Sequence, residues 1–152
     1  MASLVTSDKL SSTLKVASYD HDPGATTAII TSPDGGTTKR VQDMRDFAHF
    51  MVMAKPTIVA AGCLTKLEIV AATDSAITTA VVVKDSGTVA ADALNDYVML
   101  ECTVDELAHL GENLRYLAAR LTMATSTDEA CVTYIAGAAR YPGAGLTATN
   151  IT

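Results

Sequence analysis

The segment Tyr97-Val98-Met99-Leu100-Glu101-Cys102-Thr103-Val104-Asp105-Glu106 changes character at its midpoint. Its first six residues are mainly apolar, include a β-branched and an aromatic residue and carry one charge, a composition that predicts a mostly buried strand. Thr103 and Glu106 then match the capping box, in which the hydroxyl and the carboxylate each bond the other residue's backbone N–H. The sequence therefore predicts a strand that runs directly into a short helix over about 103–110, with Gly111 in a left-handed conformation closing the last turn.

The residues after this helix predict two more strands. Residues 114–123 have apolar residues at positions that fit either a helix or a strand. The polar turn formers of 124–128 and the strand-like residues 130–135 favour the strand, and together they predict a hairpin. Gly137, Pro142, Gly143 and Gly145 then predict the end of regular structure.

The first half also consists of short strand-like runs separated by turn formers. Strands are expected at 13–19, 25–31, 37–41, 57–61, 64–70 and 77–83, with 37–41 pairing back on 25–31 as a hairpin. Residues 47–53 are read as a strand that ends before Lys55-Pro56, although 42–53 has the propensity of a helix. The alternation over 64–70 predicts a strand with one face toward solvent.

About nine short strands at intervals near ten residues predict a mainly β protein, an antiparallel β-sandwich of jelly-roll type with one short helix. A chain of 152 residues suits one domain. We expect an N-terminal arm at 1–11, the sandwich at 12–142 and a C-terminal tail at 143–152, with both ends gaining order on docking.

Charge and hydropathy narrow the class of partner. The net charge of −6, without a dense basic cluster, disfavours nucleic acid and anionic membranes. The chain contains neither a signal peptide pattern nor an apolar run long enough to span a bilayer, so synthesis in a cytoplasm is expected. Hydrophobic residues make up 49% of the chain, more than a small core requires, and the surplus hints at contacts between subunits.

The residues that could carry chemistry do not form a recognisable catalytic or metal motif. Cys63, Cys102 and Cys131 lie in apolar runs, and we expect three reduced, buried thiols. His21, His49 and His109 lack the spacing of metal ligands. Asp105-Glu106 and Asp128-Glu129 are adjacent pairs whose side chains do not face each other, and Glu106 and Asp128 already have expected roles in a cap and a turn. We therefore expect no enzyme activity, no cofactor and no metal.

Four short segments carry a resemblance to a known class of protein: 95–103, 114–116, 127–130 and 134–135. In these segments the chain resembles virion structural proteins of tailed bacteriophages, of the capsid decoration or cement type. The resemblance implies an accessory coat subunit that oligomerises, contacts the major capsid protein, stabilises the phage head and carries no catalytic residues. The expected location is the virion, after synthesis in the host cytoplasm.

The expected subunit contacts lie in the two ends of the chain, because arms that order on docking can add a strand to an exposed sheet edge. The candidate contact residues are Leu4, Val5, Leu146 and Ile151. The alternative is a small ligand-binding sandwich, or an enzyme whose site is assembled from distant loops near His21 or His49.

Overall fold

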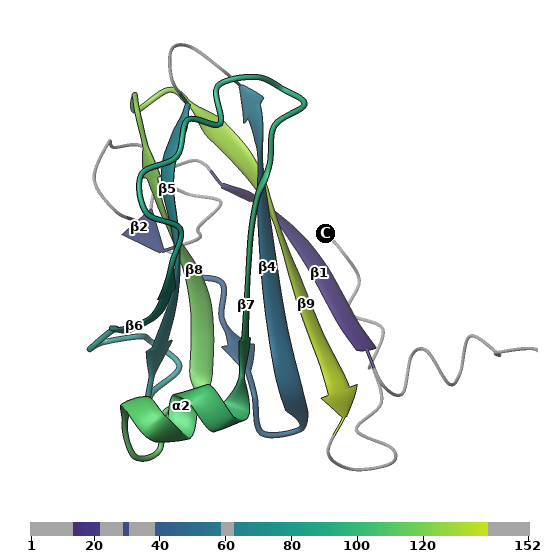
Figure 1. Ribbon diagram of the computed structural model, residues 1–152, viewed down its shortest axis with the longest axis vertical. Helices are drawn as coiled ribbons and strands as arrows, with labels where there is room; N and C mark the ends of the chain where they lie inside the picture. Colours follow the sequence, from purple (N-terminus) through teal and green to yellow (C-terminus); the bar gives the residue numbers. More distant parts are fainter. Residues whose placement is uncertain (1–13, 22–28, 31–38, 59–62, 140–152) are drawn as a thin grey trace, which may run out of the picture.

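Two antiparallel β-sheets pack face to face in the computed structural model, which describes residues 14–21, 29–30, 39–58 and 63–139 (Figure 1). Sheet A has the strand order β1 (Leu14–His21), β9 (Glu129–Ala139), β4 (Phe47–Ile58) and β7 (Val98–Thr103). Sheet B has the order β2 (Ile29–Ile30), β8 (Tyr116–Met123), β5 (Leu64–Ala72) and β6 (Val81–Asp85), and β3 (Gln42–Asp43) also pairs with β8. The prediction of a mainly β sandwich is confirmed.

The core lies between the sheets and is built from alternate residues of their strands. Sheet A contributes Phe50, Val52, Val132 and Tyr134, while sheet B contributes mainly aliphatic side chains. The largest of these sheet B residues are Leu64, Leu67, Ile69, Leu117 and Leu121. Because successive strand residues point to opposite faces, this leaves the other half of each strand outside the sandwich.

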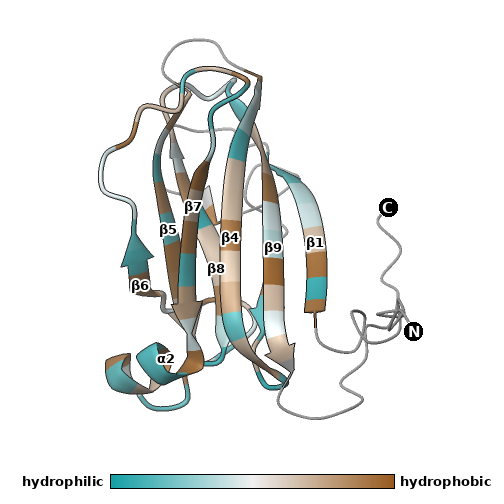
Figure 2. Ribbon diagram, turned by 45° about the vertical axis from the view of Figure 1, so that its right-hand side comes forward, coloured by the Kyte–Doolittle hydropathy of each residue, from teal (hydrophilic) through white to brown (hydrophobic). Residues whose placement is uncertain are grey.

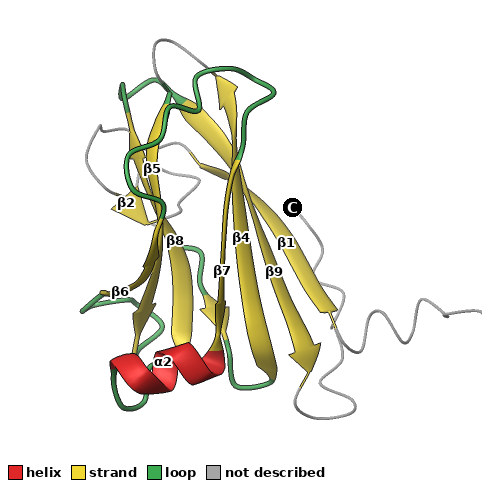
Figure 3. Cartoon of the chain, viewed as in Figure 1, coloured by secondary structure: helices red, strands yellow, loops and turns green. Residues whose placement is uncertain are grey.

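Most strands that follow one another in the chain lie in opposite sheets; the exceptions are β2 with β3 and β5 with β6, which all belong to sheet B. In particular β8 belongs to sheet B and β9 to sheet A, so the predicted hairpin between them is wrong (Figure 3). The intervening turn crosses from one sheet to the other, and it is held by the Asp128 carboxylate, which accepts a hydrogen bond of 2.9 Å from the Thr125 N–H. The finer assignment of a jelly roll stays a prediction.

Strand β4 is longer than predicted, because it continues through Lys55-Pro56 to Ile58. The prediction of a break at Pro56 and a separate strand at 57–61 is therefore wrong over the described residues. Strand β7 pairs with β4 only as far as Ala54, so Pro56 lies where β4 has β9 as its neighbour in the described chain, and a bulge follows it. A proline that lacks a donor is tolerated where one side of the strand needs none.

The short helix α2 (Val104–Leu110) follows β7 without a loop, as predicted (Figure 3). The N–H of Thr103 donates to Glu106 Oε2 at 2.8 Å, and the N–H of Glu106 donates to Thr103 Oγ1 at 3.4 Å. These bonds confirm the capping box. Gly111 has a φ of 171°, which is extended backbone, so the predicted left-handed closure is wrong, and the first left-handed residue after the helix is Asn113.

The outer face of sheet B is covered by part of the chain itself. The loop after β5 brings Ile77 onto Val70, Ala72 and Ala118 as a second small apolar cluster. Asp74 organises this loop, since its carboxylate accepts hydrogen bonds from the N–H groups of Ala76 and Thr78. The predicted solvent-facing side of the strand at 64–70 is therefore wrong, and the strand predicted at 77–83 begins only at Val81.

The pairing of the shortest strands differs from the predicted hairpin between 25–31 and 37–41. Within the described residues, Ile29–Ile30 and Gln42–Asp43 each pair with β8, and residues 39–41 form no strand. The arm at 1–11 and the tail at 143–152 lie outside the described residues, so the domain boundaries stay predictions. No helix in the described chain is long and apolar enough to cross a membrane.

Candidate interaction surface

The outward residues of sheet A form four rows that cross the sheet in register, and we call them together the outer A face. The two central rows are Val16, Ile135, Met51 and Glu101, followed by Ser18, Thr133, Met53 and Met99. The two end rows are Leu14, Gly137, His49 and Thr103 at one end, and Asp20, Cys131 and Lys55 at the other.

Apolar side chains occupy most of the two central rows. Val16 is 50% exposed and Met99 is 52% exposed, while Ile135, Met51 and Met53 between them are half-buried. Figure 2 shows the four strands of sheet A side by side in the order β1, β9, β4 and β7, with bands of hydrophobic residues along them. Contiguous exposed apolar residues of this kind are typical of interaction sites.

The two hydroxyl groups in the central rows are bonded to each other. Ser18 Oγ and Thr133 Oγ1 lie 2.9 Å apart and form a hydrogen bond between β1 and β9. Removing a polar group from water is costly mainly when it loses its partner, and these two groups would keep theirs. The centre of the outer A face can therefore be dehydrated at low cost.

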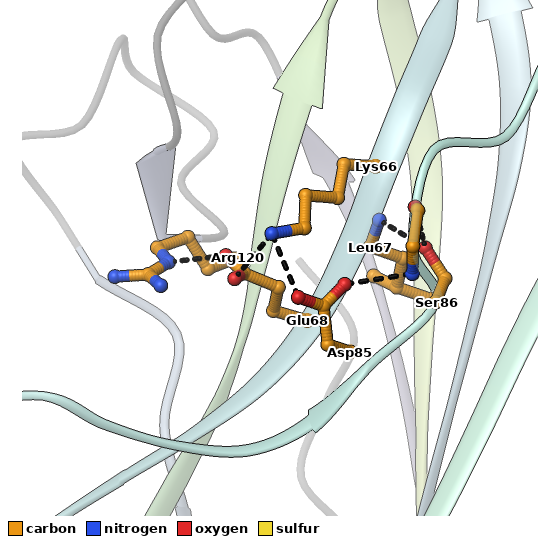
Figure 4. A network of polar contacts seen from close by, with 7 residues as sticks. Lys66, Leu67, Glu68, Asp85, Ser86 and Arg120 are labelled. Carbon is orange, nitrogen blue, oxygen red and sulfur yellow. Dashed lines mark hydrogen bonds and ion pairs between the residues drawn. The ribbon is translucent and has the colours of Figure 1, made fainter.

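Sheet B presents charge on its outside, next to its covered apolar cluster. The nearly buried carboxylate of Glu68 accepts hydrogen bonds from Arg120 Nε at 2.6 Å and from Lys66 Nζ at 3.0 Å (Figure 4). The Arg120 bond is the main reason that the pKa of Glu68 lies below its usual value. Lys66 also reaches Asp85 at 2.8 Å, so two positive and two negative groups balance within one network.

That network also ties the edge strand β6 to β5. Ser86 Oγ accepts a hydrogen bond of 3.0 Å from the N–H of Leu67, and Asp85 accepts one of 2.7 Å from the N–H of Gly87 (Figure 4). Gly87 has a φ of 67°, a conformation that favours glycine. These hydrogen bonds hold the residues that follow β6 against β5. They occupy polar groups that could otherwise bind a partner.

A groove of about 660 Å³ lies where the outer A face approaches α2. Its lining includes Leu14, His49, Met51, Glu101, Lys84 and Glu106. Lys84 forms an ion pair of 2.5 Å with Glu106, and the hydrogen bond from Lys84 is the main cause of the lowered pKa of that carboxyl. The groove is thus lined by apolar side chains on the side of sheet A and by the ion pair of Lys84 with Glu106 on the side of α2.

The three histidines lie apart in the fold. His49 is exposed on the outer A face, His21 is buried on the inward side of β1, and His109 is exposed in the last turn of α2. Neither predicted acidic pair forms a dyad, since Glu106 caps the helix and Asp128 holds the turn. Across the described residues, no three His, Cys, Asp or Glu side chains gather in a way that could hold a metal ion.

The three cysteines differ from one another more than the sequence indicated. Cys63 and Cys102 are buried, and burial raises their pKa values to about 11 and about 12. Cys131 is only half-buried and belongs to an end row of the outer A face. The prediction of free thiols is confirmed, and the prediction of burial is wrong for Cys131.

The contact residues expected from the sequence, Leu4, Val5, Leu146 and Ile151, lie outside the described residues. Sequence reasoning missed the outer A face, although the sequence carries a signal for it. Residues 47–54 and 98–102 carry apolar residues on both faces of their strands, with His49 and Glu101 as the polar exceptions, whereas only one face of each strand can pack in the core. A strand that is apolar on both sides needs two coverings.

Comparison with known proteins assigns no family. No protein-family model matches the chain, and no curated protein matches it. A solved structure titled "PRD1 vertex protein P5" matches with 12% sequence identity and a TM-score of 0.38, over 84% of this chain and 98% of that chain. A similarity of this size assigns neither a family nor a function.

Proposed function

We propose that this protein is a structural subunit of a virus particle, of the decoration or cement type. In this role it associates with copies of itself, contacts the major capsid protein and stabilises the head of a tailed bacteriophage. The proposal includes the absence of enzyme activity. The sequence resemblance in segments 95–103, 114–116, 127–130 and 134–135 is its starting point.

The observation that carries the proposal is the outer A face. A sandwich that covers one of its outer faces with its own loop and leaves the other apolar and exposed has surface to offer to another protein. The network around Glu68 and the ion pair of Lys84 with Glu106 balance their own charges. The surface that remains available to a partner is the exposed apolar area of the outer A face, which suits a protein that binds neighbouring subunits of a particle.

Immunogold electron microscopy of particles purified from the native source tests the location. We expect antibody against this protein to label the outside of intact heads, and the label to disappear when the antibody is preabsorbed with purified protein. Label confined to the tail would contradict the decoration role. Label found only in the particle-free supernatant would contradict any role in the virion.

The predicted arms can be tested on the same particles. Residues 1–13 and 140–152 hold the candidate contacts, and the described residues next to them in the sequence, Leu14 and Ala139, lie at the same end of sheet A. We expect both segments to exchange amide hydrogens quickly in isolated protein and more slowly in the assembled state. Equal and fast exchange in both states would rule out contacts through Leu4, Val5, Leu146 and Ile151.

The groove beside His49 favours a second candidate function, a small ligand-binding module. Its volume of about 660 Å³ lies in the range of ligand pockets, and His49, Glu101 and Lys84 could supply polar contacts. Thermal shift assays with a panel of nucleotides, sugars and carboxylic acids test this candidate. A saturable shift that His49→Ala abolishes would favour it, particularly if the protein is monomeric.

A further inference from the structure

We propose that the outer A face is the surface through which two copies of this chain associate, each contributing the same residues. This inference deepens the proposed function, on which it rests, by naming the surface used for self-association. The occupant is a second copy of the chain, packed face to face so that the central rows of one copy cover those of the other.

The charge distribution favours a second copy as the occupant. The chain carries a net charge of −6, so most of its surface repels another copy. The outer A face carries only Asp20, Glu101 and Lys55 as formally charged groups, which leaves it at −1 with His49 neutral. Self-association through this face therefore meets little repulsion.

The position of the charges on the face also fits an interface. Asp20 and Lys55 lie in an end row, and Glu101 lies on the edge strand β7, so no charged side chain lies between Val16 and Met53. Protein interfaces have the same arrangement, with an apolar centre that is poor in charge and often rich in methionine, inside a polar rim. The bonded pair of Ser18 and Thr133 adds no unsatisfied group to that centre.

The size of the face sets the expected affinity. With strands about 4.8 Å apart and residues about 3.3 Å apart, β1, β9 and β4 over seven residues and β7 over five cover about 410 Å², or about 820 Å² for two copies. This lies below the roughly 1,000 Å² expected of a specific interface. The face alone therefore supports a weak, concentration-dependent pair.

A matched pair of valine substitutions tests the proposal. Val16 is 50% exposed on β1, an edge strand of sheet A, and Val82 is 39% exposed on β6, an edge strand of sheet B. Either substitution by glutamate adds the same charge to an exposed strand residue. Sedimentation equilibrium of the full chain should show that Val16→Glu weakens self-association at least about tenfold, while Val82→Glu changes it less than about twofold.

Two results of that experiment would overturn the proposal. One is wild-type protein that stays monomeric up to millimolar concentration, and the other is an equal effect of the two substitutions. A monomeric protein that still labels phage heads would refute this interface and the self-association, and leave the proposed role on the phage head intact. Protein that associates through this face but is never found on particles would support the interface and refute the proposed role in the virion.

A second measurement needs no substitution, so it holds if Val16→Glu fails to fold. Methionine methyl NMR follows Met51, Met53 and Met99 on the outer A face, with the buried Met44 and Met123 as internal references. We expect the methyl signals of the first three to shift with protein concentration while the two references stay constant. If the average molecular mass increases with protein concentration while the signals of Met51, Met53 and Met99 do not shift, the assignment of this face is refuted.

Discussion

The hydroxyl oxygen of Tyr134 on β9 accepts a hydrogen bond of 2.7 Å from the backbone N–H of Ala119 on β8, and so links the two sheets through the core. The same hydroxyl donates to the carbonyl oxygen of Arg40 at 3.1 Å. The ring packs edge-on against Tyr19 and Phe50 with centroids 5.2 Å apart in both cases. One side chain therefore joins β1, β4, β8, β9 and the segment before β3.

Replacing Tyr134 by phenylalanine keeps the ring and removes both hydrogen bonds of the hydroxyl. We expect the free energy of unfolding to fall by about 1–3 kcal/mol, because both bonds are made away from bulk water. Urea denaturation followed by circular dichroism measures the change. Tyr97→Phe is the control, since Tyr97 is 62% exposed, and it should alter stability by less than about 0.5 kcal/mol. Equal effects of the two substitutions would contradict the role of the Tyr134 hydroxyl.

Acid should destabilise the protein partly through Glu68. Its pKa lies below the usual value of 4.5 because Arg120 and Lys66 bond the charged form, so the folded state binds fewer protons than the unfolded state. The stabilisation is complete above about pH 4.5 and is lost as the pH falls through the lower folded value. Asp43, whose pKa Arg115 lowers, contributes in the same direction.

Glu68→Gln should therefore reduce the dependence of unfolding free energy on pH below about pH 4.5. Urea titrations at intervals of half a pH unit measure that slope, and Glu112→Gln, at an exposed residue, is the control. An unchanged slope in Glu68→Gln would show that the ion pairs of Figure 4 do not stabilise the folded state.

The capping box of α2 should have a local effect. Thr103→Ala removes the oxygen that accepts from the Glu106 N–H, and we expect a loss of about 1 kcal/mol. Amide exchange should accelerate over residues 107–111 and remain unchanged in β5 and β8. Thr88→Ala, at an exposed position, should have neither effect, and a cap variant that exchanges like the wild type would contradict the prediction.

Thiol reactivity should separate Cys131 from the other two cysteines. At pH 8 the thiols of Cys63 and Cys102 are protonated, because burial raises their pKa values to about 11 and about 12. A disulfide reagent should therefore modify about one thiol per native chain rapidly at low protein concentration, and three after unfolding. Cys131→Ser should abolish the rapid reaction, and a rapid reaction that persists in this variant would contradict the prediction.

Local chemistry predicted α2 and most strands. The capping residues determine where the helix begins within a few atoms of themselves, so Thr103 and Glu106 sufficed to locate it. The choice of strand over helix for 114–123 was also correct, because the turn at 124–128 and the apolar residues after it favoured consecutive strands.

The errors concern contacts between distant segments. A turn such as 124–128 can reverse a strand within one sheet or carry the chain to the opposite sheet, and its own sequence fits both. The alternation of 64–70 indicated a wet face, but Ile77 and Arg120 cover that face from elsewhere in the chain. The outer A face was missed for the same reason, since it exists only after four separate strands align.

The unequal covering of the two sheets limits how far assembly can proceed. If only one sheet presents an apolar outer surface, a second copy that packs face to face covers that surface, and assembly stops at a closed pair. A molecule with apolar surfaces on both sides would instead stack into filaments. By bringing Ile77 onto the outer face of sheet B, the loop anchored by Asp74 removes the second surface that such stacking would need.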